Sequence, residues 1–165
     1  MSTVAFIGTD RLKTATAAQN ASFRASLDAG RFADFGPSVH FDWWAFPIDR
    51  ASRGHGDRYD ISSVLDALRA DGHFLRDVLG NAGMLMSAWG WDLESARPVD
   101  GSLYPRYGVR LWKCGLSLHI LGMPGAFASV RAFAIHHRES RTIDEWPSQG
   151  DCTPNAAGVD VMPHS

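Results

Sequence analysis

The sequence predicts an all-α protein, a single compact bundle of about five helices around a buried helix at 109–121. Three features lead to this fold class. Apolar residues recur at helical spacing in several segments, and glycine and proline separate those segments. The segment 109–121 is apolar nearly all round, as expected of a helix at the centre of a bundle. We divide the 165 residues into a lead-in over 1–9, a helical domain over 10–138 and a flexible tail over 139–165.

The first predicted helix covers residues 13–29. This segment is rich in alanine, carries Phe23 and Leu27 at i and i+4, and stops at Gly30. The preceding stretch 4–9 could open a dinucleotide-binding unit, being a short strand that ends in glycine. The second and third glycines of that fingerprint are missing, so we interpret the stretch as a lead-in.

An aromatic stretch at 40–50 follows and organises the middle of the chain. Its eleven residues include two tryptophans, two phenylalanines, two aspartates, a histidine and an arginine. The rings need burial, and the charged groups need partners or water. Pro47 ends any helix that begins near Ser38, because proline lacks an N–H and clashes with the preceding turn. The polar residues 49–60 predict a solvated loop.

Two helices are predicted next. Ser63 and Asp66 have the spacing of a capping box, in which a hydroxyl and a carboxylate satisfy free amides at a helix start. Asp71 is placed to cap a second helix, whose apolar residues recur over 74–89 until Gly90 ends it. Glycine inside this helix would let another helix approach closely.

The remaining segments are a long connection, two helices and the tail. Residues 91–108 contain two prolines and predict a connecting loop. The helix at 109–121 keeps one narrow polar stripe, and His119 opposite that stripe is interpreted as a hydrogen-bonded core histidine. Residues 126–138 predict the last helix. The low hydrophobicity of 139–165 predicts disorder.

Charge and cysteine usage exclude several function classes. A net charge of −2 gives no general attraction to nucleic acid or to an acidic membrane surface. No run is long enough to span a bilayer, and we expect no signal peptide at residues 1–8, which lack a basic leader. Cys114 lies in an apolar run and Cys152 in a polar tail, so no disulfide is indicated. We therefore expect a cytoplasmic protein.

Three blocks of the sequence resemble a known family. Residues 44–48, Trp-Ala-Phe-Pro-Ile, resemble the Trp-Leu-Phe-Pro-Ile/Leu core of the opioid growth factor receptor conserved region, which also occurs as a stand-alone bacterial domain. Residues 86–93 and 109–122 are similar to its two later blocks, in the same order. The chain departs from the family at two places. The family has glutamine where this chain has Trp43, and it has His-Asn where this chain has Tyr107-Gly108. The resemblance implies an all-α bacterial domain and no assigned reaction.

A second resemblance is weaker and points the same way. His40, Trp43, Phe46 and Pro47 match the His-x-x-Trp-x-x-Phe-Pro motif of a small uncharacterised family of bacterial helical proteins. This family also implies an all-α domain, and its reaction is not assigned.

Metal binding and acid–base catalysis are the first chemistries to weigh. Two His-x-Asp units, at 40–42 and 55–57, carry groups that could bind a metal, but neither has the helical spacing that arranges ligands on one face. We predict no metal and no cofactor. Acid–base catalysis would use Asp42 with His40, since neighbouring tryptophans could shift the pKa of the carboxyl. The alternative is that Asp42 caps a helix or pairs with Arg50 or Arg110.

An anion site is the second possibility. Arg110 and Lys113 project from the predicted core helix, and Arg50 comes from the loop, so their convergence would bind phosphate or carboxylate. Trp43 and Trp44 could stack an aromatic ring beside them. The alternative is that Arg110 pairs with an aspartate of 42–49 and locks the aromatic stretch to the core.

Three functions are therefore compared. The first is a non-catalytic domain that binds a small anionic aromatic ligand or a peptide at the tryptophan–arginine surface. The second is an enzyme that uses Asp42 and His40, and the third is single-stranded nucleic-acid binding, which the negative net charge disfavours. We predict the first, with no membrane partner. The sequence leaves the oligomeric state open. Trp44, Phe46 and Pro47 are expected to seat the aromatic stretch on the helix at 109–121.

Overall fold

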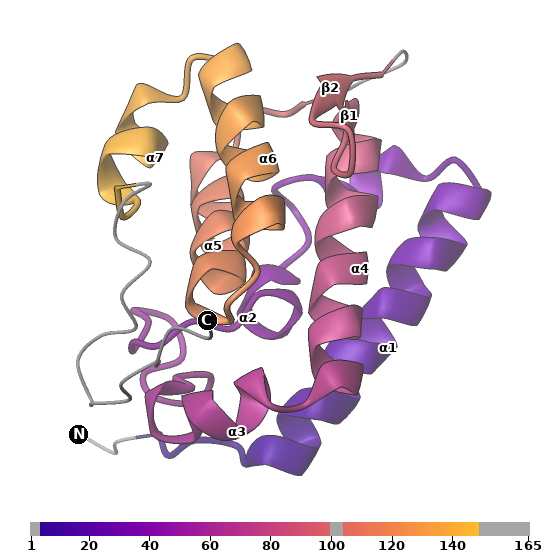
Figure 1. The fold of residues 1–165 in the computed structure, drawn as a ribbon. Helices are drawn as coiled ribbons and strands as arrows, with labels where there is room; N and C mark the ends of the chain where they lie inside the picture. Colours follow the sequence, from indigo (N-terminus) through magenta and orange to yellow (C-terminus); the bar gives the residue numbers. More distant parts are fainter. Residues whose placement is uncertain (1–3, 100–103, 149–165) are drawn as a thin grey trace, which may run out of the picture.

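The computed structural model describes residues 4–99 and 104–148. These residues form seven α-helices, two 3-10 helices and one two-stranded sheet, so the predicted mostly helical fold is confirmed (Figure 1). The helices outnumber the predicted five because two of them, Asp42–Ala45 and Ser140–Glu145, have only four and six residues, too short to produce a periodic apolar pattern. Within the described segments, no helix combines the length and apolar character needed to cross a membrane.

The two longest helices pack side by side. They are α1 (Thr9–Asp28) and α4 (Gly72–Ala88), and Figure 1 shows them along the right-hand side of the molecule. A Cβ on Gly80 would lie 2.5 Å from Asn20 Nδ2, so glycine allows the close approach that the sequence predicted. The predicted cap of α4 is confirmed, because the Asp71 carboxylate accepts hydrogen bonds from two amides of the first turn.

A second group consists of α5 (Gly108–Ile120), α6 (Pro124–His136) and α7 (Ser140–Glu145). The helix predicted at 109–121 is confirmed within one residue at each end. It packs against α2, α4, α6 and α7, and nine of its thirteen residues are buried. The three members of its predicted polar stripe, Arg110, Lys113 and Ser117, are among the buried residues, so that stripe faces other segments rather than water.

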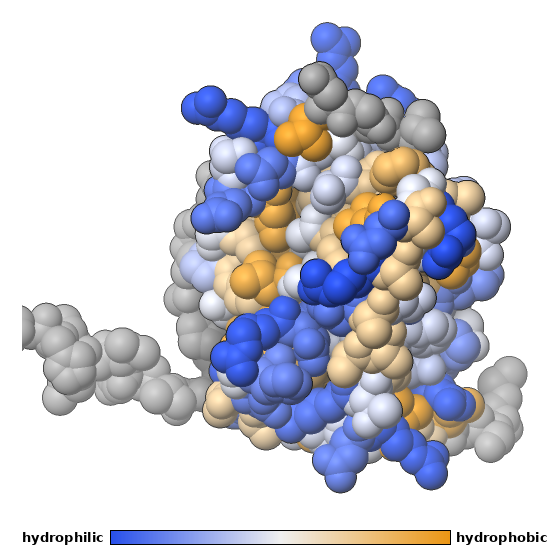
Figure 2. All heavy atoms as spheres, turned by 90° about the vertical axis from the view of Figure 1, so that its right-hand side faces the viewer, coloured by the Kyte–Doolittle hydropathy of each residue, from blue (hydrophilic) through white to orange (hydrophobic). Residues whose placement is uncertain are grey.

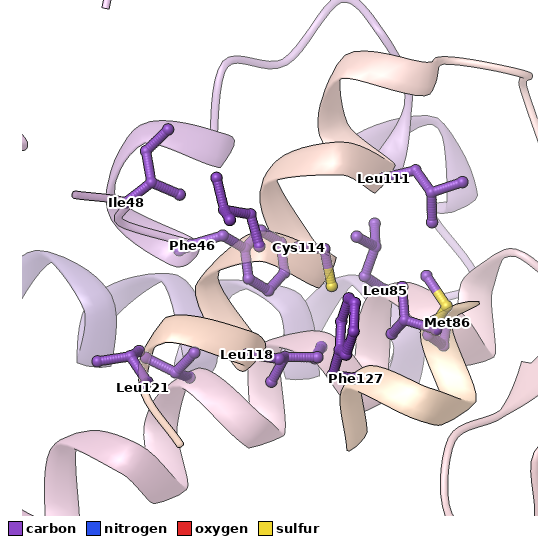
Figure 3. Packing of buried hydrophobic residues seen from close by; sticks show 14 of the residues in the cluster. Phe46, Ile48, Leu85, Met86, Leu111, Cys114, Leu118, Leu121 and Phe127 are labelled. Carbon is purple, nitrogen blue, oxygen red and sulfur yellow. The ribbon is translucent and has the colours of Figure 1, made fainter. Parts of the chain in front are cut away.

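The aromatic stretch forms α2 (Asp42–Ala45), a single turn that follows the 3-10 helix η1 (Phe32–Phe35). It joins the two groups of helices, since α2 contacts both α1 and α5. Figure 3 shows Phe46 in one buried cluster with Cys114 and Leu118 of α5. The hydroxyl of Ser117 donates a hydrogen bond of 2.8 Å to the carbonyl of Pro47. Phe46 and Pro47 therefore lie against α5 as expected.

The segment after α2 is more ordered than a solvated loop. Isolated bridges join Ile48 to Asp60 and Ser52 to Gly56. A 3-10 helix, η2 (Ser62–Val64), then leads into α3 (Leu65–Arg69). The predicted capping box is wrong, because the 3-10 turn occupies the helix start and neither η2 nor α3 has a side-chain cap.

The predicted loop at 91–108 contains a hairpin. Strands β1 (Trp91–Asp92) and β2 (Arg97–Pro98) pair antiparallel directly after α4. Gly90 ends α4 with a φ of 82°, in the left-handed region that favours glycine. The hairpin therefore stands at the C-terminal end of α4, as Figure 1 shows.

The predicted tail begins too early at residue 139. Residues 140–145 form α7, and the Trp146 side chain that follows is only 6% exposed. Its Nε1 donates a hydrogen bond of 2.9 Å to the carbonyl of Trp112, and its ring lies edge-on to Phe127 with centroids 5.6 Å apart. The helical domain therefore extends at least to this tryptophan. The rest of the predicted tail, 149–165, lies outside the described residues.

Candidate functional site

Asp42 is the centre of a buried charge cluster. Its side chain begins α2 and is 4% exposed. Lys113 Nζ lies 2.9 Å from Asp42 Oδ2, and Arg110 Nε lies 3.8 Å from Oδ1. Both cations come from the first two turns of α5, at i and i+3, so one carboxylate reaches both. The cluster joins α2 to α5 by charge as well as by apolar contact.

Arg110 is committed to the protein interior. Its side chain is 2% exposed, Nε donates a hydrogen bond of 3.2 Å to the carbonyl of Val39, and Nη2 donates one of 3.1 Å to that of Pro37. The guanidinium carbon lies 5.2 Å from the ring centroid of Phe41 and 4.4 Å from that of Tyr107. The planar, multiply donating head of arginine suits this arrangement. An external anion would have to displace these partners.

Lys113 is also committed. Its Nζ lies 3.1 Å from the centroid of the Trp43 ring, in addition to its contact with Asp42. Burial lowers the pKa of this ammonium from its usual value, and the negative charge of Asp42 opposes that shift. The lysine therefore supports the position of Trp43 while it neutralises the buried carboxylate.

Trp43 and Trp44 take part in a half-buried aromatic cluster with His55 and Tyr59. The His55 ring lies 4.6 Å from that of Trp43 and 5.4 Å from that of Tyr59, in edge-to-face geometry. Trp44 lies 6.0 Å from Tyr59, and its Nε1 donates a hydrogen bond of 2.9 Å to Gln19 of α1. Trp44 is therefore held to α1, a contact that the sequence did not predict.

Two further predicted site residues, His40 and Arg50, lie apart from the charge cluster around Asp42. His40 is exposed, and in the described part of the chain no hydrogen bond or ion pair joins it to Asp42. Arg50 pairs with Asp49 at 3.2 Å and lies over the Trp112 ring. The structure thus brings together four of the seven predicted residues, namely Asp42, Trp43, Arg110 and Lys113.

A different part of the molecule forms an open groove of about 840 Å³. Its walls come from one face of α4, from the hairpin and from the start of α6. Figure 2, which looks at the side that carries α1 and α4, shows apolar side chains reaching the surface beside hydrophilic ones. The residues that line the groove are Leu79, Gly83, Ser87, Trp91, Asp92, Leu93, Glu94, Val99, Met123, Pro124, Gly125 and Ala126.

The groove is apolar with an acidic edge. Asp92 and Glu94 are its charged lining residues, and Asp92 accepts hydrogen bonds from the Ser95 amide at 3.3 Å and from the Glu94 amide at 3.4 Å. These bonds, together with the bond from the Ser95 hydroxyl, hold the pKa of the Asp92 carboxyl below its usual value, the hydroxyl contributing most. Asp92 therefore stays ionised at neutral pH.

Sequence reasoning missed the groove because three separate segments build it. One signal was available in α4. Leu79 continues the apolar pattern of the helix but lies beside the buried stripe of Phe74, Val78 and Leu85, and it is 39% exposed. When the apolar arc of a helix is wider than packing against one neighbouring helix requires, the additional apolar residues suggest a second contact surface.

A third polar group connects the region before α5 to α7. The Tyr104 hydroxyl donates a hydrogen bond of 2.8 Å to Glu139, and the His137 ring lies 4.8 Å from the Tyr104 ring. Burial, reinforced by Glu139, raises the pKa of Tyr104. Burial, with help from His136, lowers the pKa of His137. The phenol stays protonated and the bond holds α7 in place, which is a structural role.

Metal and thiol chemistry find no support in the described segments. No three histidine, cysteine, aspartate or glutamate side chains there gather closely enough to hold a metal ion. Cys114 is a free, buried cysteine in α5, and burial raises the pKa of its thiol. It packs as a small apolar residue.

Comparisons with family models, with curated proteins and with solved structures find no match to this chain. The resemblance of residues 44–48, 86–93 and 109–122 to the opioid growth factor receptor conserved region therefore stays a prediction from the sequence. What the chain can do rests on its own geometry, a buried charge cluster that has its partners and an apolar groove that is open.

Proposed function

We propose that this protein is a non-catalytic binding domain that holds an elongated apolar ligand, or the apolar face of a peptide, in the groove beside α4. The observation that carries the proposal is the groove itself. Its volume of about 840 Å³ is typical of a ligand site, and mainly apolar side chains with a few polar groups line it.

The shape of the groove favours an elongated occupant. Leu79, Gly83 and Ser87 stand at i, i+4 and i+8 on one face of α4, so this wall runs for two turns, or about 12 Å. Gly83 keeps the middle of the wall open, because a Cβ there would meet only Leu93 Cδ2, at 3.9 Å. An occupant can therefore approach the α4 backbone closely.

Exposed apolar surface in the groove supplies a driving force for binding. Leu79 and Val99 are 39% and 42% exposed, although both have large apolar side chains. Covering such surface contributes about 25 cal/mol per Å². Contiguous apolar surface on a folded domain commonly marks a binding site.

The alternatives predicted from the sequence have less support. Acid–base catalysis by Asp42 needs a carboxyl that a substrate can reach, whereas this one is nearly buried between two cations. Anion binding at the tryptophan–arginine surface needs Arg110 and Lys113 to leave their present partners. Single-stranded nucleic-acid binding needs free ring faces, and Trp43 already has the Lys113 ammonium over one face.

Binding of the uncharged dye Nile red tests the proposal. The dye should gain fluorescence with the protein, and Gly83→Trp, which fills the middle of the groove, should abolish that gain. The matched control is Ala21→Trp, which introduces the same side chain at an exposed position of α1 outside the groove. Equal dye binding by the two folded variants would show that the groove is not the site.

A further inference from the structure

We infer that the occupant of the groove is a basic amphipathic helix of a partner protein, with its apolar face on α4 and its lysine or arginine side chains beside the hairpin. The inference rests on the proposed function and adds the chemical class of the partner. It follows from the charge at the groove, from the length of its α4 wall and from its glycines.

Acidic side chains supply the formal charge at the groove. Asp92 and Glu94 line it, and no lysine or arginine does so among the described residues. Arg97 stands opposite Asp92 in the hairpin register, but in the described part of the chain the two side chains form no ion pair. Glu94 is exposed. A cation on the occupant could therefore reach both carboxylates without breaking an internal ion pair.

The partial charges at the two helix termini beside the groove do not cancel the negative charge of its carboxylates. The C-terminus of α4 lies beside the hairpin, carries no basic residue in its last turn, and contributes about −0.5 charge. The first turn of α6 contributes about +0.5, toward the other end of the groove (Figure 1). These partial charges offset each other, while at the hairpin end the carboxylates of Asp92 and Glu94 outnumber the one guanidinium, that of Arg97, and leave a net charge of −1. Basic side chains of the occupant belong at that end.

The dimensions fit a helix better than a compact ligand. A wall of two turns on α4 matches two turns of a partner helix. Gly83 on α4 and Gly125 on α6 leave room between the walls, since nothing lies within 4 Å of a Cβ built on Gly125. Side chains of the occupant at i, i+3 and i+4 would then cover Leu79 and Met123. This is the helix-in-groove mode of peptide recognition.

Three synthetic helical peptides of about twelve residues test the inference by isothermal titration calorimetry. They share one leucine face and carry lysine, glutamine or glutamate on the other. We expect the lysine peptide to bind about three- to thirtyfold more tightly than the glutamine peptide, because each exposed ion pair contributes modestly. Added salt should reduce that difference. The glutamate peptide should bind most weakly.

Variants connect the preference to the groove. The double variant Asp92→Asn, Glu94→Gln keeps hydrogen-bond acceptors in the hairpin but should bind the lysine and glutamine peptides equally. Gly83→Trp should block both peptides, and Ala21→Trp neither. The expected combination is a lysine preference that disappears with the carboxylates and binding that disappears with the blocked groove.

The possible failures differ from one another. If the glutamine peptide binds as tightly as the lysine peptide and Gly83→Trp blocks both, the inferred partner is wrong and the proposed function stands. If Nile red enters the groove but no peptide binds, the helical occupant is wrong. If neither dye nor peptide responds to Gly83→Trp, both proposals fail. Self-association that Gly83→Trp abolishes would make the occupant a second copy, which also overturns the inference.

Discussion

Asp42 neutralises two cations that have almost no access to water. Lys113 and Arg110 are about 6% and 2% exposed in their side chains, and Asp42 is the acidic side chain that contacts them in the described structure. Removing one partner of a buried ion pair leaves an uncompensated charge, which costs far more than the net contribution of the pair. The stability of this region therefore depends on one carboxylate.

Replacing that carboxylate is the residue-scale prediction. Asp42→Asn should lower the free energy of unfolding by about 3–5 kcal/mol, because two buried cations lose their counter-charge while shape is nearly kept. Denaturant titration at neutral pH measures this change. Asp49→Asn is the matched control, since Asp49 pairs with a half-exposed Arg50. It should cost less than about 1 kcal/mol. A similar small cost for Asp42→Asn would contradict the assigned role.

Sequence reasoning reached part of this residue-scale picture. It placed Asp42 beside Arg110 as one alternative, because an arginine on a core helix needs a partner and the aromatic stretch offers aspartates. It did not identify the carbonyls of Pro37 and Val39 as acceptors, since backbone groups carry no sequence signature. The bond between Tyr104 and Glu139 joins residues that are 35 positions apart, which no local pattern shows.

At the scale of elements, long helices were predictable and short ones were not. α4 and α5 have 17 and 13 residues, enough for the apolar period to repeat. α7 has six residues, and it is held by the hydrogen bond between Tyr104 and Glu139 and by the contacts of the adjacent Trp146. Propensity alone does not support so short a helix in water. The sequence of 139–148 therefore looks like a tail until its neighbours are known.

Gly115 is the position on α5 that accepts Trp146. A Cβ on this glycine would lie 2.6 Å from Trp146 Cε2, closer than real contacts allow. Gly115→Ala should therefore lower the free energy of unfolding by about 1–3 kcal/mol, although alanine is the better helix former. Hydrogen exchange should report faster opening of α7 amides in the variant.

The control for this variant is a glycine with space around it. Gly125→Ala, in the first turn of α6, adds the same methyl group with nothing within 4 Å. It should be neutral or should stabilise by about 0.5–1 kcal/mol. If both variants raise stability, the contact between Trp146 and α5 is not close enough to matter.

For the whole molecule, the fold class was predictable and the candidate site was not. A mostly helical core can be predicted from the helical spacing of apolar residues within each segment. That spacing is visible in the sequence whatever the arrangement of the helices. The groove is formed by 79–87, 91–99 and 123–126, and only their packing brings them together. The aromatic stretch drew attention because its residues are adjacent, yet most of its side chains are used to join α1, α2 and α5.

The extent of the folded domain is the prediction for the whole molecule. A chain that ends at 138 should lose its cooperative thermal transition or melt well below the full chain, whereas a chain that ends at 148 should match it. The shorter chain lacks Trp146, whose burial removes roughly 150–250 Å² from water and contributes about 4–6 kcal/mol. Such a loss is comparable with the 5–15 kcal/mol that stabilises a typical domain.

Calorimetry of the two shortened chains measures the difference, and the full-length variant Trp146→Ala separates the tryptophan from the rest of the segment. That variant should melt between the two shortened chains, because it keeps the bond between Tyr104 and Glu139 while it loses the ring that covers Phe127 and Gly115. If the chains ending at 138 and 148 had the same melting temperature, the folded domain would end at 138. That result would also mean that α7 packs on α5 and α6 without contributing to their stability.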